Sequence, residues 1–91
     1  MISQYIALDT ETTGLNPAKD RVLEIGAARI YDGKVCETFD TLIDTGVEIP
    51  ERIVELTGIT DEMQKTGKKP QQAFAEFLEF CGDLPILGHN I

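Results

Sequence analysis

Two carboxylates stand two positions apart near the start of the chain, directly after a short apolar run. Asp9 and Glu11 belong to the motif Asp-Thr-Glu-Thr-Thr-Gly-Leu at residues 9–15. Side chains alternate along an extended segment, so we expect both carboxylates to project to the same side. Because divalent cations such as Mg²⁺ prefer oxygen ligands, the pattern indicates a metal-dependent hydrolase of phosphodiester bonds. On its own, such a pair beside Thr and Gly is also typical of an ordinary turn.

The composition is that of a globular domain with an excess of acidic residues. The chain has 91 residues, of which 42% are hydrophobic, and 16 acidic against 8 basic residues give a net charge of −8. This charge argues against a protein that tracks long stretches of nucleic-acid backbone. It does not argue against an enzyme that grips one chain end, because bound metal ions would supply the positive charge.

Other residue patterns bear on location and on metal or disulfide chemistry. No apolar stretch approaches the roughly 20 residues that a membrane span needs, and no secretory leader precedes the first strand, so we expect a cytoplasmic protein. Cys36 and Cys81 lie far apart without the spacing of a zinc site, and we expect both to be small core residues. Lys65, Lys68 and Lys69 are the nearest thing to a basic cluster, and we expect a solvated loop there.

Apolar runs and turn residues predict four strands, at residues 4–8, 22–31, 35–43 and 84–87. The pair Asp32-Gly33 predicts a two-residue hairpin turn, which makes the third strand antiparallel to the second. Val35, Phe39 and Ile43 should share one face of that third strand.

Three helices are predicted between the third and fourth strands. The first covers residues 50–57 and is closed by Gly58, and the second is short and capped by Thr60. The third covers residues 70–81 and ends at Gly82. Its apolar positions recur at helical spacing and are expected to face the core: Ala73, Phe74, Phe77, Leu78 and Cys81.

The order of these elements predicts which polar residues meet the carboxylates. Because a helix leads into the last strand, we expect that strand to lie parallel to the first. The residues after Leu87 would then reach the sheet edge that carries Asp9 and Glu11. His89 and Asn90 are therefore expected beside the two carboxylates.

The motifs together resemble a known superfamily. Residues 9–15 resemble the first motif of the DnaQ-like, or DEDD, superfamily of 3′-to-5′ exonucleases. Residues 49–50 and 56–63 resemble later parts of the same family, and residues 87–90 resemble the start of its second motif. The resemblance covers essentially the whole chain and includes the proofreading epsilon-type subunits and exonuclease domains of bacterial DNA polymerase III. It implies an α/β, ribonuclease H-like fold with a mixed sheet of three antiparallel strands, then helices and a fourth strand parallel to the first. It also implies that residues 1–91 are the N-terminal part of a single exonuclease domain.

The resemblance implies a metal-dependent reaction at the 3′ end of DNA or RNA that releases nucleoside 5′-monophosphates. Asp9 would bridge two divalent ions, Mg²⁺ or Mn²⁺, and Glu11 would bind one of them. His89 would be a supporting residue, because the base of the histidine-type branch lies in a later motif. Residues in the positions that contact the terminal nucleotide are Thr12, Thr13, Gly14, Leu15, Leu56, Thr57 and Asn90. The residues themselves also allow plainer roles, namely turn hydrogen bonds for the polar side chains and core packing for the two leucines.

By the same resemblance, the second metal-binding Asp would fall a few positions beyond Ile91, and the third motif further along. We therefore expect the 91-residue chain alone to be nearly inactive. We also expect it to self-associate, since a sheet edge and an apolar face would be exposed.

Two other readings of the sequence stay open. One is a non-catalytic module that docks onto a polymerase or nuclease chain. A weaker one is a phosphatase with Asp9 as nucleophile, although the pattern that such enzymes place after the aspartate is missing. The residues do not distinguish DNA from RNA, because both present the same phosphodiester.

Overall fold

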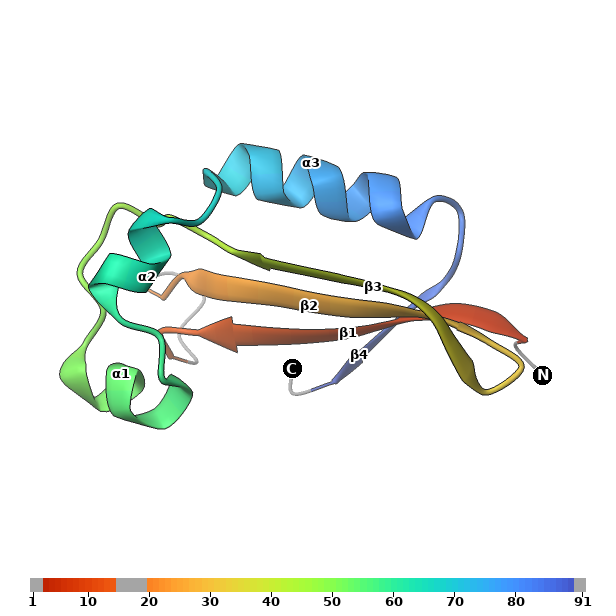
Figure 1. Cartoon of the computed structure of the whole chain (residues 1–91), viewed down its shortest axis with the longest axis horizontal. Coiled ribbons are helices and arrows are strands. Elements are labelled where there is room, and N and C mark those ends of the chain that lie inside the picture. The colour runs from red at the N-terminus through yellow and green to blue at the C-terminus, as the bar shows by residue number, and fades with distance from the viewer. Residues whose placement is uncertain (1–2, 15–19, 90–91) are drawn as a thin grey trace.

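Four strands form one mixed sheet in the order β3-β2-β1-β4 (Figure 1). The computed structural model describes residues 3–14 and 20–89, so Leu15 and Asn90 lie outside the described residues. The strands are β1 (Gln4–Thr12), β2 (Val22–Tyr31), β3 (Lys34–Leu42) and β4 (Ile86–His89). β1 pairs with β2 and β2 with β3 in antiparallel fashion, while β4 is parallel to β1. The predicted mixed sheet is confirmed, including the direction of its last strand.

Two strand boundaries differ from the prediction. β1 continues to Thr12 instead of ending at Leu8, because β2 offers backbone partners along its whole length. Asp9 and Glu11 therefore lie inside the strand rather than beyond its end. β4 begins at Ile86, two positions later than predicted. Pro85 has no N–H for the ladder, and only its carbonyl takes part, accepting from the Ile6 amide at 2.8 Å.

The β2–β3 hairpin has the predicted turn but also an irregularity. Asp32 and Gly33 have φ angles of 49° and 77°, as a two-residue turn of this type requires. Farther along, Arg29 pairs with Glu37 while Ile30 pairs with Val35, so Cys36 is an extra, bulged residue. The bulge breaks the alternation of side chains in β3. The prediction that Val35 lies on the same face of this strand as Phe39 is therefore wrong, because Val35 pairs with Ile30 and Phe39 with Ala27. The prediction that Cys36 is a core residue is also wrong, since Cys36 is exposed.

Three helices follow the sheet's first three strands: α1 (Glu51–Thr57), α2 (Asp61–Lys65) and α3 (Pro70–Cys81). Gly58 ends α1 with a φ of 78°, in the left-handed region that favours glycine. The hydroxyl of Thr60 accepts a hydrogen bond from the Met63 amide at 3.1 Å and caps α2. These local predictions are confirmed. No helix in the described part of the chain is long and apolar enough to cross a membrane.

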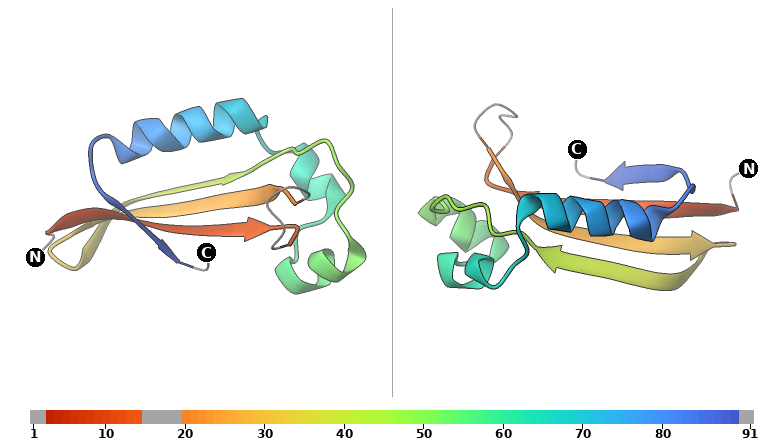
Figure 2. Two further views of the ribbon diagram at one scale, coloured as in Figure 1. Left: turned by 180° about the vertical axis from the view of Figure 1, so that it is seen from behind. Right: turned by 90° about the horizontal axis from the view of Figure 1, so that it is seen from above.

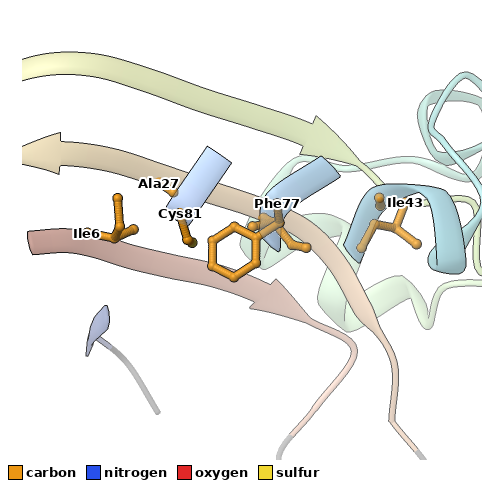
Figure 3. Close-up of a cluster of buried hydrophobic side chains, with 7 residues drawn as sticks. Ile6, Ala27, Ile43, Phe77 and Cys81 are labelled. Carbon is orange, nitrogen blue, oxygen red and sulfur yellow. The ribbon is translucent and has the colours of Figure 1, made fainter. Parts of the chain in front are cut away.

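The main core lies between α3 and one face of the sheet (Figures 1 and 2). Figure 3 shows side chains of this cluster, which holds Ile6, Ile25, Ala27, Ile43, Ala73, Phe77 and Cys81. Phe74 and Leu78 were expected in the core, but they are 42% and 63% exposed. A helix that packs on one sheet contacts it through a narrow stripe of side chains. Apolar side chains beside that stripe therefore stay exposed to solvent.

A second, smaller core attaches α1 to the sheet. Leu23 of β2 is fully buried there against Ile49, Ile53 and Ile59. Figures 1 and 2 show α1 and α2 at the end of the sheet toward which β1 runs. The second core therefore holds α1 close to the end of the strand that carries the two carboxylates.

The lysines before α3 include two that are paired with acids, although Lys65 and Lys69 are exposed to solvent as expected. Lys68 forms an ion pair with Glu76, and Nζ of Lys69 lies 3.0 Å from Oδ2 of Asp44. Gly67 allows this loop to approach β3, because a Cβ there would lie 2.5 Å from the Leu42 carbonyl oxygen. Two of the three basic charges in this region are therefore neutralised within the chain.

Candidate active site

Asp9 and Glu11 lie on the face of β1 that points away from α3. Asp9 is opposite Gly26 and Glu11 is opposite Glu24 in the antiparallel register. The neighbours of Gly26 along β2 pack against α3, so the alternation of side chains puts these carboxylates on the other face. The predicted projection of Asp9 and Glu11 to one side agrees with this arrangement.

Two carboxylates that the sequence analysis did not single out join them. Asp40 of β3 pairs with Gly26, so that Asp9, Gly26 and Asp40 follow one another across three strands. The result is a small hollow of about 130 Å³, lined by Asp9, Thr10, Glu11, Glu24, Gly26 and Asp40. Gly26 has no side chain to fill the space between its neighbours. A Glu among the apolar residues at the start of β2 was the one local signal of such a site.

Crowding of negative charge changes the titration of Glu24. A hydrogen bond with Asp40 is the largest cause, followed by burial and by the charges of Asp40, Glu11 and Asp9. Together they raise the pKa of Glu24 from 4.5 to about 7. Near neutral pH, the hollow thus holds a carboxyl group that exchanges its proton readily beside the carboxylates of β1.

A larger hollow of about 590 Å³ opens where β1 ends near α1. It is lined by Thr10, Glu11, Thr12, Gly14, Arg52, Ile53, Leu56 and Thr57. Thr10 and Glu11 line both hollows, so the two adjoin. Leu56 is 79% exposed and is therefore no core residue. The structure brings together four residues that the family resemblance implied would contact a terminal nucleotide, namely Thr12, Gly14, Leu56 and Thr57. Arg52 lines the same hollow and was not predicted there.

The threonines of the motif also hold their own turn together. The hydroxyl of Thr12 donates to the Gly14 carbonyl at 2.8 Å. Thr13 donates to Oδ1 of Asp20 at 3.0 Å and accepts from the Arg21 amide at 2.8 Å, and it is not among the described residues that line the larger hollow. These bonds tie Thr13 to Asp20 and Arg21, which is the plainer role that the sequence allowed, and its contact with a nucleotide stays a prediction.

Two further residues of the predicted site, Gly14 and Thr57, have close contacts with their neighbours. A Cβ on Gly14 would lie 2.5 Å from Oδ2 of Asp20, so this position has no room for a side chain as packed. The Thr57 hydroxyl donates to the Ile53 carbonyl at 2.8 Å and accepts from the Ile59 amide at 3.1 Å. Both contacts fix the wall of the larger hollow.

β4 brings a distant part of the chain to the carboxylates. In the parallel register His89 is the partner of Asp9, as predicted from the order of the elements. Asn90, the next residue, lies outside the described residues, as does Leu15.

The donor set suits divalent cations only in part. Carboxylate oxygens are the ligands that Mg²⁺ and Mn²⁺ take. Four acidic residues line the small hollow, yet no three described Asp, Glu, His or Cys side chains converge closely enough to hold an ion. Among the described residues, Asp9 and Glu11 are thus the two carboxylates that β1 offers to such an ion.

Comparison with known proteins gives consistent matches along the chain. A family model described as "Exonuclease" (RNase_T) matches residues 6–91. The DNA polymerase III PolC-type of Lacticaseibacillus paracasei is 38% identical over 89 residues, and that of Thermotoga petrophila is 42% identical over 86 residues. These alignments cover 98% and 94% of this chain, but only 6% of each relative.

Solved structures of the same shape are also exonucleases. The nuclease domain of 3'hExo, described as a DEDDh family member bound to rAMP, has a TM-score of 0.81 at 16% identity, covering 96% of this chain and 52% of that one. A product-bound structure of exonuclease I has a TM-score of 0.78 at 26% identity, covering 99% of this chain and 22% of that one. At 16% identity, the first likeness concerns the fold alone.

Proposed function

This chain belongs to the RNase_T exonuclease family of the DEDD superfamily, and from that premise we propose that it forms the N-terminal part of a metal-dependent 3′-to-5′ exonuclease domain. The substrate is the single-stranded 3′ end of DNA, or of RNA, and the products are nucleoside 5′-monophosphates. The relatives' printed name, DNA polymerase III PolC-type, supports a proofreading role beside a DNA polymerase. We place this activity in the cytoplasm.

One observation carries the proposal: Asp9 and Glu11 share one face of β1, and Glu11 also borders the larger hollow beside α1. A nucleotide held in the larger hollow would have its phosphate next to the carboxylates. Leu56, which is exposed, offers an apolar surface to a base, and Thr12 and Gly14 line the same hollow. This arrangement suits a chain end better than the middle of a duplex.

Asp9 and Glu11 would hold the divalent ions, Mg²⁺ or Mn²⁺. Such ions supply an activated water and stabilise the charge on the leaving oxygen. The chain's own contribution is to present both carboxylates from a rigid strand and to orient the terminal nucleotide from α1. The raised pKa of Glu24 limits how much uncompensated negative charge gathers in the hollow near neutral pH.

The described residues supply two of the carboxylates that such a site needs. Mg²⁺ demands near-octahedral coordination, which two side chains hold only loosely. We therefore propose that residues 1–91 alone hydrolyse nucleic acid poorly, and that further ligands come from outside the described residues or from another chain.

The test is release of mononucleotides from 3′-labelled single-stranded DNA in the presence of Mn²⁺, using the full natural polypeptide that carries these residues. Asp9→Ala should lower the rate by more than about 100-fold, because it removes a metal ligand without touching the core. Asp83→Ala removes an equal charge from the exposed turn before β4 and is the matched control. Full activity of Asp9→Ala would refute the assignment.

A non-catalytic docking module is the second candidate. It is favoured by the lack of three converging ligands among residues 3–14 and 20–89. The same assay decides between the two: no nucleotide release by the natural polypeptide, combined with retained binding to a polymerase chain, would support docking and exclude the exonuclease.

A further inference from the structure

The described basic side chains near the sheet are mostly neutralised by acids of the same chain. Arg29 forms an ion pair with Glu37 and lies over the ring of Phe80, 4.8 Å from its centroid. Lys68 and Lys69 have the acidic partners already described. Arg52, like Lys34 and Lys65, makes neither an ion pair nor a side-chain hydrogen bond within the described part of the chain. Its guanidinium is therefore available to a ligand.

Arg52 also occupies a distinctive place. Of the described residues that line the larger hollow it is the one basic residue, and Glu11 lines the same hollow. Asp9, Glu24 and Asp40 lie in the adjoining small hollow. A phosphate that approaches this region meets several acidic side chains at short range, and repulsion between like charges weakens its binding.

The backbone that carries Arg52 is well anchored. The next residue, Ile53, is 5% exposed and belongs to the core cluster with Leu23 and Ile59. The Ile53 amide donates to the Pro50 carbonyl at 2.9 Å, which fixes the start of α1. The long side chain of Arg52 is thus attached to a rigid support at the border of the hollow, as a specific binding residue requires.

We propose that the guanidinium of Arg52 binds a phosphate group of the single strand that enters the hollow between the end of β1 and α1. Its planar fork can donate two parallel hydrogen bonds to phosphate oxygens. It supplies a positive charge on the α1 side of a hollow that Glu11 of β1 also lines. The inference rests on the proposed function, and it makes Arg52 a substrate-binding residue rather than a catalytic one.

The experiment measures binding of a short, 5′-fluorescein-labelled oligothymidylate to the full natural polypeptide by fluorescence anisotropy. Ca²⁺ replaces Mg²⁺, because its larger and more flexible oxygen shell favours binding over turnover. Arg52→Gln should weaken binding by about fivefold and lower the slope of log affinity against log salt by about 0.7, the contribution of one phosphate contact on a single strand. Arg52→Lys keeps the charge and should restore most of the slope.

Lys34→Gln is the matched control, since it removes the same charge from the β2–β3 hairpin. Figure 1 shows this hairpin and α1 at opposite ends of the sheet. Lys34→Gln should leave both affinity and slope unchanged. Displacement of the oligonucleotide by thymidine, which has no phosphate, tests whether Arg52 contacts the nucleoside instead of a phosphate. Arg52→Gln should leave thymidine binding unaltered.

The outcomes separate this inference from the function on which it rests. An unchanged salt slope in Arg52→Gln, or an equal loss of affinity for thymidine and for the oligonucleotide, would overturn the phosphate contact. Nucleotide release by the wild-type polypeptide would still support the exonuclease in that case. Absence of both oligonucleotide binding and nucleotide release in the wild type would overturn both.

Discussion

Changing Asp40 to asparagine should lower the pKa of Glu24 and reduce the pH dependence of folding stability. The hydrogen bond that protonated Glu24 donates to Asp40 is the largest cause that raises the pKa of Glu24 to about 7, and the charge of Asp40 is a further one. Asp40→Asn removes both, and its amide can instead donate to ionised Glu24. We expect the pKa of Glu24 to return more than halfway to 4.5.

The effect on stability follows from the direction of the shift. Glu24 holds its proton more tightly in the folded chain than in the unfolded chain, so its contribution to stability is fully present below about pH 4.5 and is lost as the pH rises through about 7. A difference of about 2.5 between the two pKa values, at about 1.36 kcal/mol each, gives at most about 3.4 kcal/mol. Because water screens this partly open hollow, about 1–2 kcal/mol is the expected loss.

The pKa can be measured from the carbon-13 chemical shift of the Glu24 carboxyl group, titrated from about pH 4 to about pH 9 with EDTA present. Urea unfolding at about pH 5 and about pH 8 gives the free energy of unfolding. At the higher pH, Asp40→Asn should be about 1 kcal/mol more stable than the wild type, and the difference should shrink at the lower pH.

Glu55→Gln, an exposed change on α1 outside the lining of both hollows, is the control and should leave the Glu24 midpoint where it is. A wild-type midpoint near 4.5, or a midpoint that does not move in Asp40→Asn, would refute the reasoning.

Two further predictions concern the support of the larger hollow and the packing of the loop before α3. Ile53→Ala should lower the free energy of unfolding by about 2–4 kcal/mol, because it empties the core under α1. Leu56→Ala on the same helix should change stability by less than about 0.5 kcal/mol but weaken oligonucleotide binding, as urea unfolding and anisotropy would reveal. Gly67→Ala should cost about 1–3 kcal/mol in urea unfolding, since its Cβ would collide with the Leu42 carbonyl. Gly46→Ala, where a Cβ would meet nothing within 4 Å, reports the cost of a positive φ alone.

Local chemistry determined much of the secondary structure. The turn at Asp32-Gly33 and the bounds of α3 at Pro70 and Cys81 agree with the sequence prediction to the residue. Each depends on neighbours along the chain: φ preferences of the turn residues, proline at a helix start and the periodicity of apolar side chains. The motif at residues 9–15 likewise indicated the exonuclease family, which the comparisons confirm.

The register between strands determined which side chains lie beside the carboxylates of that motif. Glu24 and Asp40 join Asp9 because hydrogen bonds between strands align positions far apart in sequence, and a shift of one residue would have turned them to the other face. A bulge in β3 opposite Arg29 and Ile30 places Cys36 on the surface, and no local sequence pattern predicted this bulge.

The packing of α1 was a tertiary outcome as well. The apolar residues of this short helix predicted a buried side, and Ile53 occupies it. Leu56 had two roles open to it, core or contact with a nucleotide, because periodicity shows that a helix has an apolar face but not which part of it the sheet covers. Only the docking of α1 beside the end of β1 exposes Leu56 and sets it, with Arg52, on the wall of a hollow that Glu11 also lines. The sequence thus specified the carboxylates and the elements that carry them, whereas the three-dimensional packing, through contacts between distant segments, created the site around them.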